Sequence, residues 1–330
     1  MAGIHRALIA GTGSIGRRHV ATLRTLRPDL RFALLRADAR RDAYSRELDA
    51  EVFSTLETAL AWGPDLAVIA TPTDLHAALI GPLVDAGVAT FIEKPVVITA
   101  EDADDLSRRD PAALPPTQVG CVLRFLEVFG TLRTWLDEGR LGRLARARIE
   151  CGQYLPDWRP GTDYRLSYSA TSERGGGVIF DLVHELDLAV GLLGAERLEH
   201  VMAAKRSALE LACEDVALLH LTSADGLPIS VGLDYVSRTP VRNVEIVGED
   251  ASARLDFIGR RLTLTGPHGV VETMDAGFDI EAAYTTQFAE LIGAIEQGTG
   301  TRLPLHEGLK ATRLAIAAHQ SLSHRMRAAA

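Results

Sequence analysis

The sequence feature that most constrains this chain is the run AGTGSIGRRH at residues 10–19, which follows the apolar segment Ala7–Ala10. Gly11, Gly13 and Gly16 have G-x-G-x-x-G spacing where a predicted strand passes into a predicted amphipathic helix. The first glycine permits a tight turn, the second lets the backbone approach a pyrophosphate, and the third lets the helix pack closely on the sheet. Free N–H groups at the helix start receive phosphate charge. We therefore predict a dinucleotide site formed by Gly11, Thr12, Gly13, Ser14, Ile15 and Gly16.

Composition limits the partners and the setting of the chain. With 330 residues it is long enough for two domains, and a net charge of −9 without a dense Lys/Arg run argues against nucleic acid or an anionic membrane as a partner. We find no signal peptide and no segment long enough to span a bilayer. Cys121, Cys151 and Cys213 lie far apart, without a C-x-x-C pair, which fits a reducing compartment. We expect a soluble, cytoplasmic protein.

The order of predicted elements indicates an α/β fold of two domains. Strands alternate with helices through residues 1–122, the pattern of a doubly wound parallel sheet, or Rossmann domain. Residues 123–330 form the predicted second domain, a large, mostly antiparallel, open-faced sheet with few helices. Its first strand, at 144–153, places Ala145, Ala147, Ile149 and Cys151 on one face. Further strands are predicted at 198–207, 216–222, 229–237, 242–247, 253–258 and 261–265, and closing helices, able to pack back on the first domain, at 280–297 and 306–326.

The second strand, at residues 31–36, ends where an acidic residue commonly binds the adenosine ribose, about 20 residues beyond the glycine motif. This chain has Arg36 there, with Arg40 and Arg41 close behind. An arginine can pair with a 2′-phosphate and stack on adenine, which favours NADP over NAD. Asp38 could still reach a ribose hydroxyl, and Arg40 and Arg41 could simply begin a solvated helix, so both cofactors remain open.

Two later strands of the first domain also end in polar turns. The apolar strand 66–70 leads into a turn containing Thr71, Pro72, Thr73 and His76, and the strand 89–92 leads into Glu93-Lys94-Pro95. In an open α/β sheet, ligands bind outside the carboxyl ends of the strands. We therefore expect both turns to face the cofactor.

The segment YLPDWRPGTDYRLSY at residues 154–168 combines aromatic rings with charged groups. Ring faces can stack on the C–H patches of a sugar, while Arg and Asp bind its hydroxyls or a carboxylate. Arg159 or Arg165 could also hold a substrate phosphate. The alternative is an ordered loop packed on the second sheet. The predicted substrate-binding residues are Tyr154, Trp158, Arg159, Asp163, Tyr164 and Tyr168.

A triple glycine at residues 175–177 precedes a predicted helix that carries Asp181 and His184, three residues apart and so on one helix face. A histidine titrates near neutral pH, and a neighbouring carboxylate can fix its tautomer and raise its basicity, so the pair suits proton transfer. A purely structural histidine is the alternative. The H-E-x-x-H pattern is absent after His184, so we expect no metal.

Together these motifs resemble the Gfo/Idh/MocA family of NAD(P)-dependent oxidoreductases over nearly the whole chain. The resemblance rests on the glycine loop 11–16, the turn 71–76, Glu93-Lys94-Pro95, and the triple glycine leading to Asp181 and His184. Residues 152–170 resemble a branch found among surface-polysaccharide and acidic-sugar biosynthesis proteins. The family implies a Rossmann domain, an open-faced second sheet that commonly forms a homodimer or homotetramer interface, and oxidation or reduction at a sugar or cyclitol carbon.

The resemblance also implies roles for individual residues. Lys94 would orient the reacting hydroxyl and lower its pKa, and Glu93 would contact the nicotinamide ribose. His184 would be the general acid/base, with Asp181 beside it and the substrate. Thr71, Pro72 and His76 would line the nicotinamide end of the site.

One spacing departs from the family, because most members place the counterparts of Asp181 and His184 four residues apart rather than three. This leaves the role of Asp181 open more than that of His184. Two alternatives to a net dehydrogenase remain: a lyase or glycosidase that oxidises its sugar only transiently with bound NAD, and a non-catalytic cofactor-binding protein.

Overall fold

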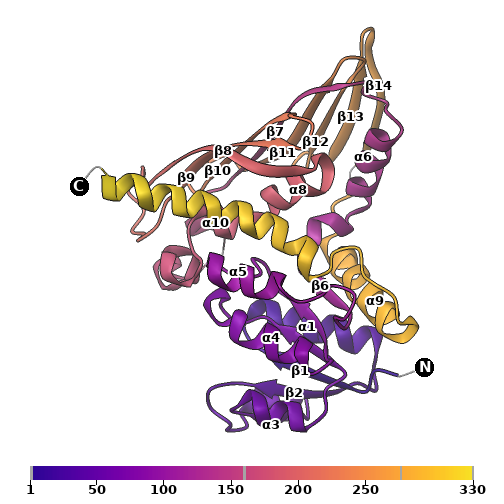
Figure 1. Ribbon diagram of the computed structural model, residues 1–330, viewed down its shortest axis with the longest axis vertical. Coiled ribbons are helices and arrows are strands. Elements are labelled where there is room, and N and C mark those ends of the chain that lie inside the picture. Colours follow the sequence, from indigo (N-terminus) through magenta and orange to yellow (C-terminus); the bar gives the residue numbers. More distant parts are fainter. Residues whose placement is uncertain (1–2, 159–160, 276, 329–330) are drawn as a thin grey trace. The chain divides into compact units, whose positions relative to one another are not determined.

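The computed structural model describes residues 3–158, 161–275 and 277–328 (Figure 1). The chain divides into two units, residues 1–122 with 281–309, and residues 123–280 with 310–330. Each unit is built around one sheet. The two sheets, one parallel and one mostly antiparallel, confirm the predicted α/β fold class.

The first unit contains a six-stranded sheet in the order β3-β2-β1-β4-β5-β6, in which every neighbouring pair is parallel. The strands are β1 (Arg6–Ala10), β2 (Arg31–Leu35), β3 (Glu51–Phe53), β4 (Leu66–Ile69), β5 (Ala89–Ile92) and β6 (Thr117–Val119). The helices are α1 (Ser14–Leu26), α2 (Ala43–Glu47), α3 (Leu56–Ala61), α4 (Ala77–Asp85), α5 (Ala100–Ser107) and α9 (Ile280–Gln297).

Strands β1, β4 and β5 lie side by side at the centre of the sheet, and their positions determine where the predicted cofactor site lies. These strands are buried at nearly every residue, as expected for the centre of a parallel sheet covered on both faces. Their carboxyl ends lie at one edge, which therefore carries the glycine loop and both predicted polar turns. Phe288, Leu291 and Ile292 of α9 belong to the same hydrophobic core as Phe91 of β5.

The second unit contains an eight-stranded sheet in the order β14-β13-β12-β11-β7-β10-β9-β8, antiparallel except for the β7–β10 pair. The strands are β7 (Leu144–Gly152), β8 (Ala195–Ala204), β9 (Val216–Ser223), β10 (Pro228–Asp234), β11 (Val241–Gly248), β12 (Ser252–Asp256), β13 (Arg261–Gly266) and β14 (Gly269–Asp275). The helices are α6 (Glu127–Asp137), α7 (Val178–Asp181), α8 (Val183–Leu193) and α10 (Leu305–Ala328), of which α10 runs through both units.

The structure differs from the sequence predictions at three places. Ala145 is exposed, since it precedes the first β10 partner of β7 at Ala147. The edge strand β14 was not predicted, because it is exposed along most of its length and lacks a buried alternating face. The helix predicted to carry Asp181 and His184 is broken at Leu182, whose φ of −96° and ψ of 32° separate α7 from α8.

Candidate active site

The glycine loop between β1 and α1 has the shape that a pyrophosphate needs. Gly11 has a φ of +96°, and a Cβ there would lie 2.4 Å from the carbonyl oxygen of Ala70. A Cβ on Gly16 would lie 2.1 Å from the carbonyl oxygen of Gly11. Gly13, in contrast, has nothing within 4 Å of such a Cβ, and it precedes α1 without a side-chain cap. The protein therefore requires glycine at 11 and 16 for its own packing, and leaves open space at Gly13.

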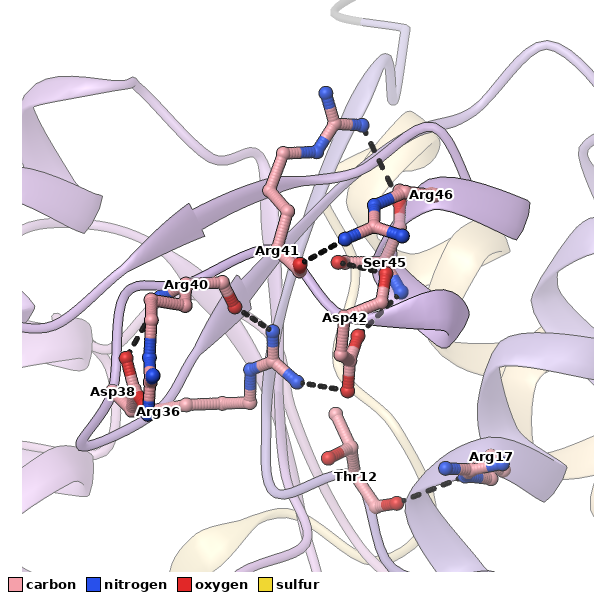
Figure 2. Close-up of polar contacts among 9 residues, drawn as sticks. All are labelled: Thr12, Arg17, Arg36, Asp38, Arg40, Arg41, Asp42, Ser45 and Arg46. Atoms are coloured by element: carbon pink, nitrogen blue, oxygen red, sulfur yellow. Dashed lines mark hydrogen bonds and ion pairs between the residues drawn. The ribbon is translucent and has the colours of Figure 1, made fainter.

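The adenosine end of the cradle is a network of charged side chains (Figure 2). Arg36 Nη1 donates to Asp42 Oδ2 at 2.7 Å and Nη2 donates to the carbonyl of Arg40 at 3.0 Å, while Arg40 Nε donates to Asp38 at 2.7 Å. The Ser45 backbone N–H, followed by Arg36, holds the pKa of Asp42 well below its ordinary value. Asp38, which could have bound a ribose, is thus paired with Arg40, and Arg36 is paired with Asp42.

The turn after β4 contains a buried histidine whose ring is bound to the backbone. His76 is fully buried, with Nε2 3.0 Å from the carbonyl oxygen of Thr71 and Nδ1 3.1 Å from that of Val96. Burial lowers the pKa of His76. Its ring therefore connects the backbones that follow two strand ends. Thr71 and Pro72 are half-buried and Thr73 is buried.

Glu93, at the end of β5, is held by a histidine that the sequence analysis did not single out. Glu93 Oε1 lies 2.7 Å from Nε2 of His19, which is 0% exposed, and Glu93 Oε2 accepts the backbone N–H of Lys94 at 3.1 Å. Burial alone would raise the pKa of Glu93, but His19 and Lys94 outweigh it and leave the pKa lowered. Both carboxylate oxygens therefore have partners inside the protein.

That His19–Glu93 pair links two functional segments of the first unit. His19 lies on α1, directly behind the glycine loop, and its ring packs against Phe91, Tyr284 and Phe288. Lys94 follows Glu93 and precedes a cis peptide to Pro95. The helix that begins at the phosphate cradle is therefore hydrogen-bonded to the residue next to the predicted catalytic lysine.

In the second unit, Asp181 is held by two phenols. Tyr168 donates to Oδ1 at 2.6 Å and Tyr235 donates to Oδ2 at 3.0 Å. Tyr235 is 0% exposed, and burial, followed by the charge of Asp181, raises its pKa well above the ordinary value. Since both phenols donate, Asp181 accepts hydrogen bonds at both oxygens. Tyr168 therefore belongs to the site, but its hydroxyl is bound to the predicted catalytic aspartate.

The triple glycine allows the chain before Asp181 to pack closely against the turn that carries Tyr168. A Cβ on Gly176 would lie 2.2 Å from the carbonyl oxygen of Tyr168, and the Gly176 N–H donates to the carbonyl of Thr171 at 3.0 Å. Only glycine permits this approach, which holds the Tyr168 turn against the segment that leads to Asp181.

His184 is half-buried on α8, and two ion pairs anchor that helix. Asp187, one turn further on, lies 2.7 Å from Arg124, and Glu185 lies 2.7 Å from Arg242 of β11. Both acids are fully buried, so breaking either pair would leave a buried charge without its counter-ion. The ion pairs therefore fix the helix that carries His184.

The residues of the aromatic segment contact other parts of the second unit and one another. The Trp158 ring lies 5.3 Å from that of Tyr235, edge to face, and Tyr164 Oη accepts the backbone N–H of Glu210 at 3.1 Å. Asp163 is bound to Arg165, two residues away, at 2.7 Å. Arg159 lies outside the described residues.

One residue that the sequence analysis did not single out lies beside this segment. The guanidinium carbon of Arg238 is 3.5 Å from the centroid of the Tyr154 ring. Neither Arg238 nor Tyr235 stands in a recognisable local motif, and only the pairing of β7 with β10 brings them to the segment.

Lys94 belongs to the first unit, and Asp181 and His184 belong to the second. A parallel sheet with an open glycine loop, joined in one chain to a sheet with an anchored histidine and a phenol-bound aspartate, defines a dinucleotide-dependent enzyme of the oxidoreductase class.

Comparison with known proteins identifies the family. Residues 5–110 match the Gfo/Idh/MocA oxidoreductase family, NAD-binding Rossmann fold, and residues 129–254 match the Gfo/Idh/MocA C-terminal domain. The two matches cover more than half of the chain, which therefore belongs to the Gfo/Idh/MocA family of oxidoreductases. Its first unit has the NAD-binding fold of that family.

Individual relatives agree with this assignment. The chain is 26% identical to scyllo-inositol 2-dehydrogenase (NAD(+)) of Bacillus subtilis, over 86% of this chain and 82% of that one. It is 26% identical to UDP-N-acetylglucosamine 3-dehydrogenase of Acidithiobacillus ferrooxidans, over 78% and 75%. The crystal structure of an oxidoreductase from Agrobacterium radiobacter, in complex with NAD⁺, L-tartaric acid and magnesium, has the same fold, with a TM-score of 0.83 and 21% identity over 98% and 97%.

Proposed function

We propose that this oxidoreductase transfers a hydride reversibly between NAD(P) and a carbinol carbon of a sugar, sugar derivative or cyclitol. The observation that carries the proposal is that Lys94 and the glycine loop lie at the same edge of one parallel sheet, after β5 and β1, with only β4 between them. Relatives that act on an inositol and on a UDP-sugar support the substrate class.

When bound at the glycine loop, the cofactor would supply the acceptor for the hydride that leaves the carbinol carbon in the oxidative direction. His184 takes the hydroxyl proton as the carbon–oxygen double bond forms. Lys94 places positive charge beside the oxygen that becomes negative, usually the largest catalytic contribution. Asp181 orients the substrate and His184, and its two phenol donors hold the carboxylate in one position.

The test of this reaction class is net turnover of the cofactor. With a panel of sugars and cyclitols, a dehydrogenase forms or consumes reduced nicotinamide in proportion to substrate. A lyase or glycosidase that oxidises its sugar only transiently converts substrate with no net change in nicotinamide, and that result would overturn the proposal.

We propose NADP as the preferred cofactor, because three arginines and two aspartates surround the adenosine end: Arg36, Arg40, Arg41, Asp38 and Asp42. The excess of positive charge favours a 2′-phosphate, which would compete with Asp42 for Arg36. Thermal shifts with NAD⁺ and with NADP⁺ test this preference. Stronger stabilisation by NAD⁺ would show that Asp42 keeps Arg36 from binding a phosphate.

We also propose a homodimer or homotetramer formed through the open face of the second sheet. Met202 of β8 and Leu218 of β9 are cross-strand partners on that face, 59% and 50% exposed. Met202→Glu and Leu218→Glu together should shift the sedimentation coefficient to that of a monomer, and a wild-type protein that is itself monomeric would contradict the proposal.

We place the protein in the cytoplasm, which its three buried free thiols support. None of the helices in the described part of the chain is long and apolar enough to cross a bilayer.

A further inference from the structure

The parallel pair β7–β10 gathers several side chains at one edge of the second sheet. Both strands end there, and their pairing continues into the loops, where the Gln153 N–H donates to the carbonyl of Asp234 at 3.2 Å and the Leu155 N–H donates to that of Tyr235 at 3.0 Å. The β7 loop carries Tyr154, and the β10 loop carries Tyr235 and Arg238. The loops are therefore held side by side at the edge from which Tyr235 reaches Asp181.

The guanidinium of Arg238 is positioned by a ring. Its central carbon lies 3.5 Å from the centroid of Tyr154, within the range of a cation–π contact. A ring holds the flat face of a guanidinium and leaves its N–H edges free to bind an oxyanion. Arg238 is exposed, and no carboxylate in the described part of the chain forms an ion pair with it.

Arg165, one of the two arginines that the sequence analysis considered for a substrate phosphate, is arranged differently. Arg165 donates to both oxygens of Asp163 and also contacts Glu210. A substrate anion would have to displace these carboxylates, whereas at Arg238 it would displace only water. The charge available to a ligand is therefore on Arg238.

Arg238 is also close to the proposed reaction centre. It follows Tyr235 by three residues, a chain length of at most about 11 Å, and the Tyr235 hydroxyl is bound to Asp181. The Trp158 ring packs on Tyr235, and its buried indole N–H has no partner among the described residues, which leaves a second donor for a polar ligand. The loop that carries Arg238 therefore begins at the residue that is hydrogen-bonded to Asp181.

We propose that Arg238 binds an anionic group of the substrate, a carboxylate or a phosphate, so that the enzyme acts on an acidic or phosphorylated sugar in preference to a neutral cyclitol. This inference rests on the proposed function, since it names the substrate class of the same site. The planar fork of a guanidinium suits either oxyanion through paired hydrogen bonds.

The test compares matched neutral and anionic sugars: glucose with glucuronate, glucose with glucose 6-phosphate, and N-acetylglucosamine with its UDP derivative. We expect the wild-type kcat/KM to be higher for an anionic member, and Arg238→Gln to lower that kcat/KM by about 10- to 100-fold through KM, as for loss of a charged hydrogen bond. The neutral members should be unaffected. The anionic sugar whose kcat/KM falls in Arg238→Gln identifies the bound group as a carboxylate or as a phosphate. Arg140→Gln is the matched control, since Arg140 also lies over a ring, Trp135, but is paired with Glu272.

Two results would overturn the inference: a wild-type preference for the neutral sugars, or an equal loss for neutral and anionic sugars in Arg238→Gln, which would mean that Arg238 only supports Tyr154. Calorimetric binding of glucuronate and glucose 6-phosphate to the cofactor-loaded protein separates this inference from the reaction. If no sugar is turned over but the wild type binds the anion more tightly than Arg238→Gln does, the proposed function fails and the anion site stands. Equal binding refutes the anion site.

Discussion

Replacing Gly13 by Ala separates the effect of this position on protein stability from its effect on cofactor binding. Gly13 has a φ of −67° and a ψ of −174°, which alanine adopts without strain, and a Cβ there would have nothing within 4 Å. Alanine restricts the unfolded chain but caps the start of α1 less well than glycine, so the two effects oppose each other and the variant without nucleotide should keep its stability within about 1 kcal/mol of wild type. For a unit of this size, that limits the change in Tm to about 4 °C.

The same methyl group occupies the open space in which we place the pyrophosphate. We expect the Kd of the preferred cofactor to rise at least about tenfold, a loss of about 1.4 kcal/mol. Thermal unfolding without nucleotide and calorimetric titration with NAD⁺ and NADP⁺ measure the two effects.

Gly16→Ala is the control for Gly13→Ala, because its Cβ would lie 2.1 Å from a backbone oxygen, and it should lower Tm even without cofactor. A Gly13→Ala protein that loses stability as Gly16→Ala does, or that binds the cofactor as the wild type does, would refute the assignment of the open space.

Substitutions at His19, Glu93 and Glu214 give three further tests. His19→Phe keeps a ring in the aromatic cluster but removes the partner of Glu93, so urea unfolding should show a loss of about 3–5 kcal/mol, and wild-type stability would contradict the role of the pair. The lowered pKa of Glu93 means that its stabilising contribution is present at neutral pH and is lost as the pH falls below the ordinary value of 4.5. The stability gap between wild type and Glu93→Gln should therefore narrow in acid, and a constant gap would argue against it. Burial raises the pKa of Glu214, so above pH 4.5 ionisation favours the unfolded chain, and Glu214→Gln should melt higher than wild type at neutral pH but not in acid. A lower melting temperature for Glu214→Gln at pH 7 would disprove this account.

The order of strands and helices could be predicted where burial leaves a periodic pattern. The central strands β1, β4 and β5 are short apolar runs followed by turns, and β9 alternates, with Ala217, Leu219 and Leu221 buried. The edge strand β14 has no such face, since Val270 and Val271 are both exposed. The break at Leu182 could not be predicted from helical spacing, because the close packing around Gly176 and Gly177 determines where α7 begins.

The site residues also divide into those that a local pattern indicates and those that it does not. Local motifs indicate Gly13, Lys94 and His184 as candidate site residues, because the chemistry depends on residue types at fixed spacing. The partners of those residues come from distant segments: His19 and Glu93 are 74 residues apart, and Tyr235 and Asp181 are 54 apart. Such pairs follow from the order of strands in a sheet, and no local pattern records them.

Arg165 shows what a local pattern leaves open. The sequence analysis offered Arg159 or Arg165 for a substrate phosphate, and in the structure Asp163, two residues before Arg165, accepts hydrogen bonds from its guanidinium on both oxygens. The sequence signal for this ion pair was the run D-Y-R, in which an acidic and a basic residue stand two positions apart.

The central claim is that Lys94 acts on the reacting oxygen, and the most direct measurement is the rate of nicotinamide reduction by Lys94→Ala in a single turnover, with cofactor affinity measured alongside. We predict a rate reduced by about 100-fold or more with the Kd of the cofactor nearly unchanged, because the lost charge acts on the developing alkoxide. A near-wild-type rate in Lys94→Ala would contradict the account.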